Sequence, residues 1–233
     1  MLKQLITEIQ QNQNPEKVQN LTRFFKTAKG QYGEGDIFLG LIVPVQRQIA
    51  KKYQKLSLKD IQQLLDSKIH EYRLIGLLIL TYQYPKADEK QKEAIFNFYL
   101  QNTRNINNWD LVDLSTYKIV GQHLKDKDKK ILYKLAKSPD LWKKRIAMIS
   151  CYTFIKNKDF QDALEIAEIL LFDKHDLIHK AVGWMLREIG KLDQKVEENF
   201  LQKFYQTMPR TCLRYAIEKF DRQKRDFYLG RKI

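Results

Sequence analysis

The chain has 233 residues, enough for one large domain or a short solenoid, because a single core stops growing at roughly 250 to 300 residues. Hydrophobic residues make up 43% and charged residues 30%, which excludes a disordered or a membrane-embedded chain. Lysine and arginine number 42 against 28 acidic residues, giving a net charge of +14. This charge favours a polyanionic partner, nucleic acid first and anionic membrane next, although lysine-rich surfaces can also simply aid solubility.

The first 40 residues are predicted to form an irregular helical cap. Pro15 follows Asn14, a pair typical of a helix start, and glycines recur between residues 30 and 40 as in a flexible loop. The run 39–45 has strand-like composition, but Pro44 would remove a ladder donor. We therefore interpret this run as a loop that leads into a helix.

Beyond residue 40 the apolar spacing is helical. Apolar side chains recur three and four residues apart, and all five prolines fall between such segments, where they mark helix starts or ends. The pattern predicts an all-α fold with about a dozen helices, most of them roughly 10 to 18 residues long. Cys151 and Cys212 lie inside these apolar patterns, which indicates buried thiols in a reducing compartment.

A repeat of about 35 residues runs through the helical region. Four basic residues, each followed by small and apolar ones, are separated by this spacing or by twice it: Arg73, Arg145, Lys180 and Arg214. Trp109 occupies the equivalent position halfway between Arg73 and Arg145. Helix-pair repeats have this period and stack into a curved solenoid. We predict one domain over 1–233, with the cap at 1–40, repeats at about 41–220 and a tail at 221–233. Small residues should allow close packing of the repeat helices: Gly76, Ala147, Gly183 and Ala216.

The repeat register predicts a row of functional side chains on one surface. Trp109 and Asp113 are four residues apart and share a helix face, and Trp184 lies four residues past its own repeat anchor. Two indoles beside a carboxylate suit a cationic ligand. A packed tryptophan with a surface aspartate is the ordinary alternative. The basic residues predicted to contact the phosphates of a nucleic acid are Arg145, Lys180, Arg187 and Arg214. For Arg187 the alternative is an ion pair with Glu188 or Asp193.

Other motifs carry little chemistry. The segment from His175 to His179 imitates a helical zinc motif, but Asp176 stands where the protease pattern has glutamate, and the sequence offers no third ligand. The glycines near residue 33 lack the ending of a phosphate-binding loop. We predict neither a metal nor a cofactor. The polar N-terminal segment lacks the apolar core of a signal peptide, so we expect a cytoplasmic location and no membrane partner.

Four segments together resemble the AlkD family of DNA alkylation-repair glycosylases. They are the stretches at 107–113, 141–147, 180–188 and 209–219, and the similarity extends from Asn14 to about residue 220. The resemblance implies HEAT-like repeats forming an α-α superhelix with a concave basic face. It also implies hydrolysis of the N-glycosidic bond of N3- or N7-alkylated purines in duplex DNA, the first step of base excision repair.

The resemblance further implies residue roles. Asp113 matches the catalytic carboxylate, Trp109 and Trp184 match aromatic walls beside the deoxyribose of the lesion, and Arg145 matches a DNA contact. Phe24 matches a lesion-contacting aromatic position that is often tyrosine. Family members are thought to act on a base that stays stacked in the duplex. The implied partner is duplex DNA with alkylated purines, bound by a monomer associated with a bacterial-type nucleoid.

The implied chemistry agrees with the residue types. An alkylated purine already carries positive charge and leaves without protonation, so a nearby carboxylate can stabilise the sugar cation or orient water. Asp113 could do either. The alternatives are a HEAT-repeat protein that binds DNA without catalysis and a scaffold that binds acidic proteins, and both leave the pairing of indoles with a carboxylate unexplained.

Overall fold

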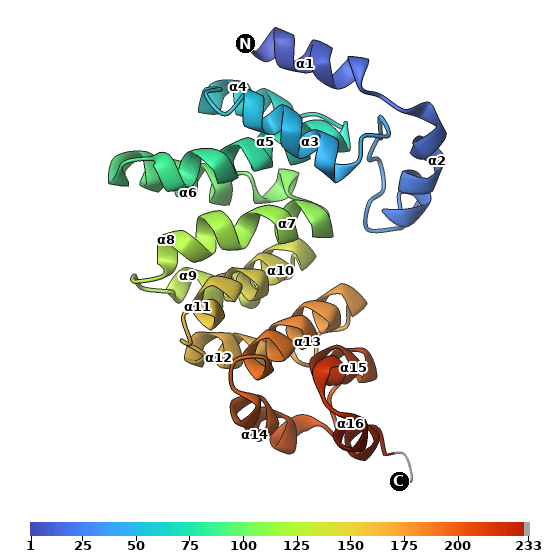
Figure 1. The fold of residues 1–233 in the computed structure, drawn as a ribbon, viewed down its shortest axis with the longest axis vertical. Helices are drawn as coiled ribbons and strands as arrows, with labels where there is room; N and C mark the ends of the chain where they lie inside the picture. Colours follow the sequence, from blue (N-terminus) through green and yellow to red (C-terminus); the bar gives the residue numbers. More distant parts are fainter. Residues whose placement is uncertain (231–233) are drawn as a thin grey trace. The chain divides into compact units, whose positions relative to one another are not determined.

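The computed structural model describes residues 1–230, which divide into two compact units, Met1–His123 and Leu124 onward. The predicted all-α fold is confirmed, since the described residues contain helices and turns with only an isolated bridge between Ile37 and Ile69 (Figure 1). Within the described part of the chain, no helix is both long enough and apolar enough to cross a membrane. That residues 1–233 form one domain stays a prediction, and residues 231–233 of the predicted tail lie outside the described residues.

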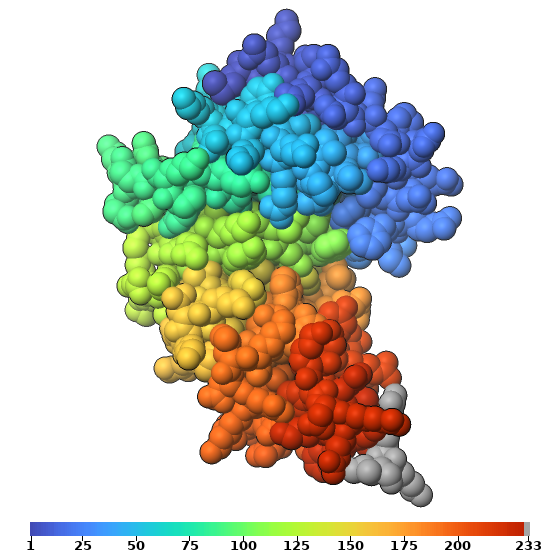
Figure 2. All heavy atoms as spheres, viewed as in Figure 1, coloured from blue at the N-terminus to red at the C-terminus, as the bar shows by residue number. Residues whose placement is uncertain are grey.

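The N-terminal unit is built around α5, His70–Gln83, which is buried along nearly its whole length. Helices α3, Val43–Lys52, and α4, Leu58–Leu65, pack on α5, and α7, Trp109–Thr116, packs on it from the next repeat. The space-filling view shows this unit, coloured blue to green, as one continuous packed body (Figure 2). The unit is completed by α1 (Leu2–Gln11), α2 (Pro15–Phe24), α6 (Glu89–Gln101) and short 3-10 turns at Tyr84–Lys86 and Thr103–Asn105.

Local sequence signals set the helix boundaries here. Pro15 lies in the first turn of α2 and Pro44 in the first turn of α3, where a missing N–H costs no hydrogen bond. Asp88 and Gln91 form a reciprocal capping box at the start of α6. The run 39–45 is a loop that enters α3, as predicted. After α7 the chain continues as a π-helical segment, Tyr117–Gly121, and then as the short α8, Gln122–Leu124.

The C-terminal unit is built around α13, Asp176–Gly190, which packs against α10, Leu141–Ser150, and α15, Arg210–Ala216. Cys151 and Cys212 are buried free thiols, as predicted. The other helices of this unit are α9 (Lys130–Ala136), α11 (Tyr152–Lys156), α12 (Gln161–Leu170), α14 (Gln194–Phe204) and α16 (Arg222–Leu229), the last inside the predicted tail.

The repeat register is confirmed at the level of helices. Each of its five anchors lies within the first five residues of a separate helix: α5, α7, α10, α13 and α15. Several helices are shorter than predicted, because turns interrupt apolar patterns that continue through them. Cys151, for example, separates α10 from α11 although both flanking segments are apolar.

A glycine allows α13 and α15 to pack closely. A methyl group added at Gly183 would lie 2.4 Å from the carbonyl oxygen of Cys212, a backbone atom that cannot move aside without shifting α15. At Gly76 the nearest atoms to such a methyl group lie at 3.4 Å and belong to leucine side chains. The two glycines therefore form a matched pair, both within helices but with different room around them.

We expect Gly183→Ala to lower the free energy of unfolding by about 2 to 3 kcal/mol, because overpacking outweighs the gain in helix propensity. Gly76→Ala should stay within about 1 kcal/mol of the wild type. Urea unfolding followed by circular dichroism measures both. Equal effects of the two substitutions would contradict the close approach of α13 and α15.

Candidate active site

The first turn of α7 lines a cavity in the N-terminal unit. The side chain of Asn108 accepts a hydrogen bond from the backbone N–H of Trp109 at the helix start. Trp109 and Asp113 follow one turn apart, and both face a cavity of about 380 Å³. Asp110 and Leu114 of α7 also line it. The remaining lining residues come from the end of α2, the loop before α3, and the starts of α3 and α5: Leu21, Phe24, Phe25, Phe38, Leu41, Ile42, Val43, Gln46 and His70.

Aromatic rings build one wall of this cavity. The ring of Phe25 stacks on Trp109 with centroids 5.2 Å apart, and Phe24 meets Trp109 edge-on at 5.5 Å. Phe24 remains 61% exposed, so its outer face is open to solvent at the cavity. Phe38 also stacks on Phe25, with ring centroids 5.0 Å apart. The structure thus brings together the predicted Phe24, Trp109 and Asp113, with Trp109 half-buried rather than sealed in the core.

A buried network of charged groups lies behind the aromatic wall. The imidazole of His70 contacts two carboxylates, Asp36 through Nδ1 at 2.9 Å and Asp110 through Nε2 at 2.8 Å. Arg73 pairs with the other oxygen of Asp36 at 2.7 Å. The network joins the 30–40 loop, α5 and α7. Two carboxylates therefore face two cations, which compensates the cost of burying each charge.

Hydrogen bonds and charges in this network shift two pKa values. Burial acts to lower the pKa of His70, but the charge of Asp110 and the hydrogen bonds to both carboxylates raise it to about 9. Burial acts to raise the pKa of Asp36, but the hydrogen bond from His70 and the charge of Arg73 hold it below its usual value. His70 is therefore an imidazolium at neutral pH.

The loop that carries Asp36 and Phe38 is anchored by Glu71. Its buried carboxylate accepts hydrogen bonds from the backbone N–H groups of Leu39, Gly40 and Leu41 at 2.9 to 3.2 Å. Gly40 has φ +91°, and a methyl group there would lie 2.0 Å from the carbonyl oxygen of Asn14. This end of the predicted flexible loop is thus held firmly and forms a cavity wall.

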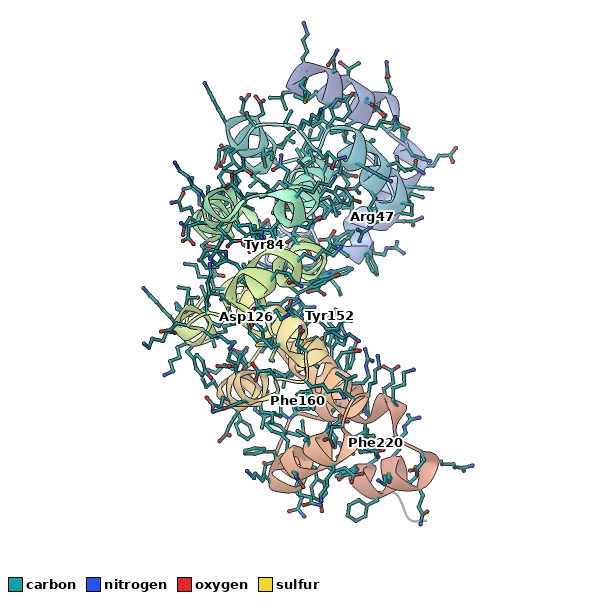
Figure 3. The ribbon with its side chains drawn as sticks, turned by 60° about the vertical axis from the view of Figure 1, so that its left-hand side comes forward. Arg47, Tyr84, Asp126, Tyr152, Phe160 and Phe220 are labelled. Atoms are coloured by element: carbon teal, nitrogen blue, oxygen red, sulfur yellow. The ribbon has the colours of Figure 1, made fainter. Side chains whose placement is uncertain are left out.

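Two further cations lie near α7. Arg47 lies on α3, labelled in Figure 3, and Lys118 lies in the π-helical segment that continues α7. Burial and the positive charge of Arg47 lower the pKa of Lys118. The ammonium of Lys118 also lies 5.6 Å from the ring centroid of Tyr117. The sequence repeat gave no signal for this pair, because neither residue occupies the repeat register.

The repeat register predicts that its basic anchors lie in a row on one surface, and this prediction is wrong for Arg73. Its guanidinium is buried against Asp36 instead of facing a surface, because two buried carboxylates require two cations. Arg145 on α10 is also 5% exposed, and its Nη1 donates a hydrogen bond to the carbonyl of Leu177 in the first turn of α13. The role of Arg145 as a DNA contact stays a prediction.

The other predicted residues of the C-terminal unit lie on α13 and α15. Lys180 pairs with Asp176 at 2.6 Å, and the indole of Trp184 donates a hydrogen bond to Glu188 at 3.2 Å. Arg187 pairs with Glu188 at 3.9 Å, one of the two partners named as its alternative role. It also pairs with Glu218 on the 3-10 turn after α15, a partner that the sequence did not suggest. Arg214 is exposed. These residues belong to a different unit from Trp109, and a surface shared by both groups stays a prediction.

The histidines of the zinc-like motif have local partners. His175 caps α13 by accepting a hydrogen bond from the N–H of Leu177, and His179 contacts the carbonyl of Asp173. Among residues 1–230, no three histidine, cysteine or acidic side chains are placed to hold a metal ion.

The sequence matches a known family over nearly its whole length. Residues 5–220 fit the sequence profile of the family described as DNA alkylation repair enzyme. The chain belongs to this family. The predicted resemblance to AlkD-type proteins is therefore confirmed. A comparison with curated proteins found no match to the sequence.

Solved structures share the fold of this DNA alkylation repair family member. A structure described as a predicted DNA alkylation repair enzyme from Enterococcus faecalis superposes with a TM-score of 0.69 at 15% identity, over 90% of this chain and 97% of that one. AlkD2 from Streptococcus mutans superposes with a TM-score of 0.56 at 17% identity, over 88% and 98% of the two chains. At such identities the likeness establishes the helical-repeat fold alone.

Several cavity residues of this family member escaped prediction. Phe25 and Phe38 are consistent with ordinary core residues, and Asp36 lies within a glycine-rich loop that appeared flexible. His70 and Asp110 gave one weak signal, since each lies within three residues of a repeat anchor. Gln46 gave none.

Proposed function

We propose that this protein hydrolyses the N-glycosidic bond of N3- and N7-alkylated purines in duplex DNA and so initiates base excision repair. The observation that carries the proposal is the placement of Trp109 and Asp113, one helical turn apart, in a cavity whose walls are mostly aromatic and aliphatic. Membership of the DNA alkylation repair family supports a role on alkylated DNA.

The cavity is suited to positive charge. The faces of Trp109 and Phe24 attract cations through their ring quadrupoles, and the carboxylate of Asp113 adds Coulomb attraction. Apolar neighbours such as Leu114 and Val43 lower the local dielectric and strengthen that attraction. An alkylated purine nucleoside carries positive charge before the reaction, and its sugar carries it during bond cleavage.

The reaction needs no acid to protonate the leaving base. In an N3- or N7-alkylated purine the C1′–N bond breaks with its electron pair going to the purine, which becomes neutral. Positive charge then develops on the deoxyribose, and Asp113 stabilises it or directs water to C1′. The network of His70, Asp36 and Asp110 holds the first turn of α7 in place for this role.

Cations of both units provide the DNA contacts in this proposal. Arg47 and Lys118 lie near the cavity helix, and the exposed Arg214 with Lys180 and Arg187 supplies phosphate contacts from the C-terminal unit. Such contacts position the duplex without reading its sequence. We further propose that the protein acts as a monomer in the cytoplasm, at the DNA.

The direct test is release of base from methylated duplex DNA by the purified full chain. N7-methylguanine and N3-methyladenine should be released, leaving abasic sites, and unmodified bases should stay in place. Duplex binding without base release from either lesion would instead support a DNA-binding repeat protein without catalysis.

A further inference from the structure

Gln46 lines the cavity and carries a buried hydrogen-bond acceptor without a partner among the described residues. The residue lies in the first half of α3, is 3% exposed and lines the same cavity as Asp113. Its Nε2 donates a hydrogen bond of 2.7 Å to the backbone carbonyl of Leu41, which fixes the orientation of the amide. The Oε1 atom of Gln46 is buried and has no hydrogen-bond partner within the described residues.

A buried acceptor without a partner costs free energy that the fold would otherwise avoid. Leaving such a group unsatisfied costs about 1 to 3 kcal/mol, and an apolar side chain of similar size would fill this position without that cost. The carbonyl of Gln46 is therefore best explained by a donor that enters the cavity.

The chemistry of DNA identifies the donor. A deoxyribose within a strand and its flanking phosphates carry acceptors only, so a ligand bound through its sugar offers no N–H or O–H group. Water is the donor that the proposed reaction must also bring to C1′. We propose that Gln46 Oε1 and the carboxylate of Asp113 together hold the attacking water, an inference that rests on the proposed function.

Two acceptors suit a nucleophilic water. A water molecule that donates one proton to Gln46 and the other to Asp113 keeps its lone pairs for the electrophilic carbon. Its oxygen bonds to C1′ as the C1′–N bond breaks, the bonding pair of that bond leaves with the purine, and one water proton passes to Asp113 and then to solvent. Gln46 is neutral and keeps its own protons, so it acts as a positioning residue.

The first test compares Gln46→Met with the wild type in single-turnover release of N7-methylguanine from duplex DNA. Methionine keeps the length and volume of glutamine but removes the acceptor. The rate should fall about 10- to 100-fold. Binding to a duplex that contains a cationic pyrrolidine in place of the lesion sugar should change less than about twofold, because that analogue needs no water. A parallel loss of rate and analogue binding would mean a purely structural role and overturn the proposal.

Gln83→Met is the matched control. The amide of Gln83 also donates to backbone carbonyls, those of Gln54 and Leu56, but this residue lies outside the cavity. Its substitution should leave base release within about twofold of the wild type. An equal loss in both variants would assign the effect to a missing amide-to-backbone bond.

A second variant keeps the test decisive even if methionine perturbs the fold. In Gln46→Glu the protonated carboxyl group can donate to Leu41 and still accept from water, whereas the ionised form cannot donate. Activity relative to the wild type should be near normal at pH 5.5 and fall as pH rises. A pH-independent ratio would contradict the proposal. If the wild type releases no base, the proposed function itself fails; if it does and Gln46→Met matches it, only this inference fails.

Discussion

Asp113→Asn should reduce release of N7-methylguanine from duplex DNA by about 100- to 1000-fold, the loss typical of removing a group that stabilises developing charge. The asparagine keeps the size of the side chain but lacks the negative charge that faces the sugar cation. Because Asp113 lines the cavity beside Trp109, its effect should appear in the chemical step rather than in binding. Single-turnover base release and duplex binding by fluorescence anisotropy separate the two.

The control for this prediction is Asp126→Asn. Asp126 is an exposed aspartate in the turn after α8, labelled in Figure 3, and its loss changes the net charge by the same amount. That variant should match the wild type in base release. Duplex affinity of Asp113→Asn should stay within about threefold of the wild type. Activity of Asp113→Asn within about fivefold of the wild type would remove the carboxylate from the reaction.

The sequence predicted the helical-repeat fold well because the repeat is periodic. Stacked helix pairs need apolar residues at three- and four-residue spacing and small residues where backbones meet, and Gly183 meets this need at α15. The helix starts at Pro15 and Pro44 were predictable for a similar reason, since proline fits only the first turn.

The environment of the site was less predictable, because it depends on contacts between distant segments. Trp109 and Asp113 share a helix face by spacing alone, so the sequence placed them together. Asp36 reaches His70 from 34 residues away through a loop without periodicity. Asp36 of the same loop pairs with Arg73, which is therefore buried instead of lying in the predicted basic row. The repeat register predicts the direction of a side chain but not its partners.

Gln46 illustrates the same limit. Its spacing relative to Ile49 and Ala50 is that of a helix face turned inward, so the sequence could place it inside the fold. Whether Gln46 Oε1 has a hydrogen-bond partner depends on the atoms that pack around it, and these come from segments distant in sequence. No sequence motif predicts them. The polar part of a site on a repeat scaffold thus emerges only when the packing is known.

His70→Phe should destabilise the protein most at pH 6 and least above pH 9. Phenylalanine keeps the ring that stacks on Phe38 at 4.6 Å but removes the cation between Asp36 and Asp110. Because the folded-state pKa of His70 is raised to about 9, its charge contributes stability that is complete below about pH 6.5 and is lost as pH rises through 9. The shift corresponds to about 3 kcal/mol.

Urea unfolding of wild type and variant at pH 6, 7.5 and 9.5 measures this difference. The gap in unfolding free energy should be about 3 to 5 kcal/mol at pH 6 and should shrink as pH rises, because removing one member of a buried charged network leaves the carboxylates undercompensated. His175 offers a contrast of opposite sign: burial lowers its pKa, so His175 disfavours the folded state as pH falls below 6.5. A gap that stays constant from pH 6 to 9.5 would show that His70 is not the buried cation of this network.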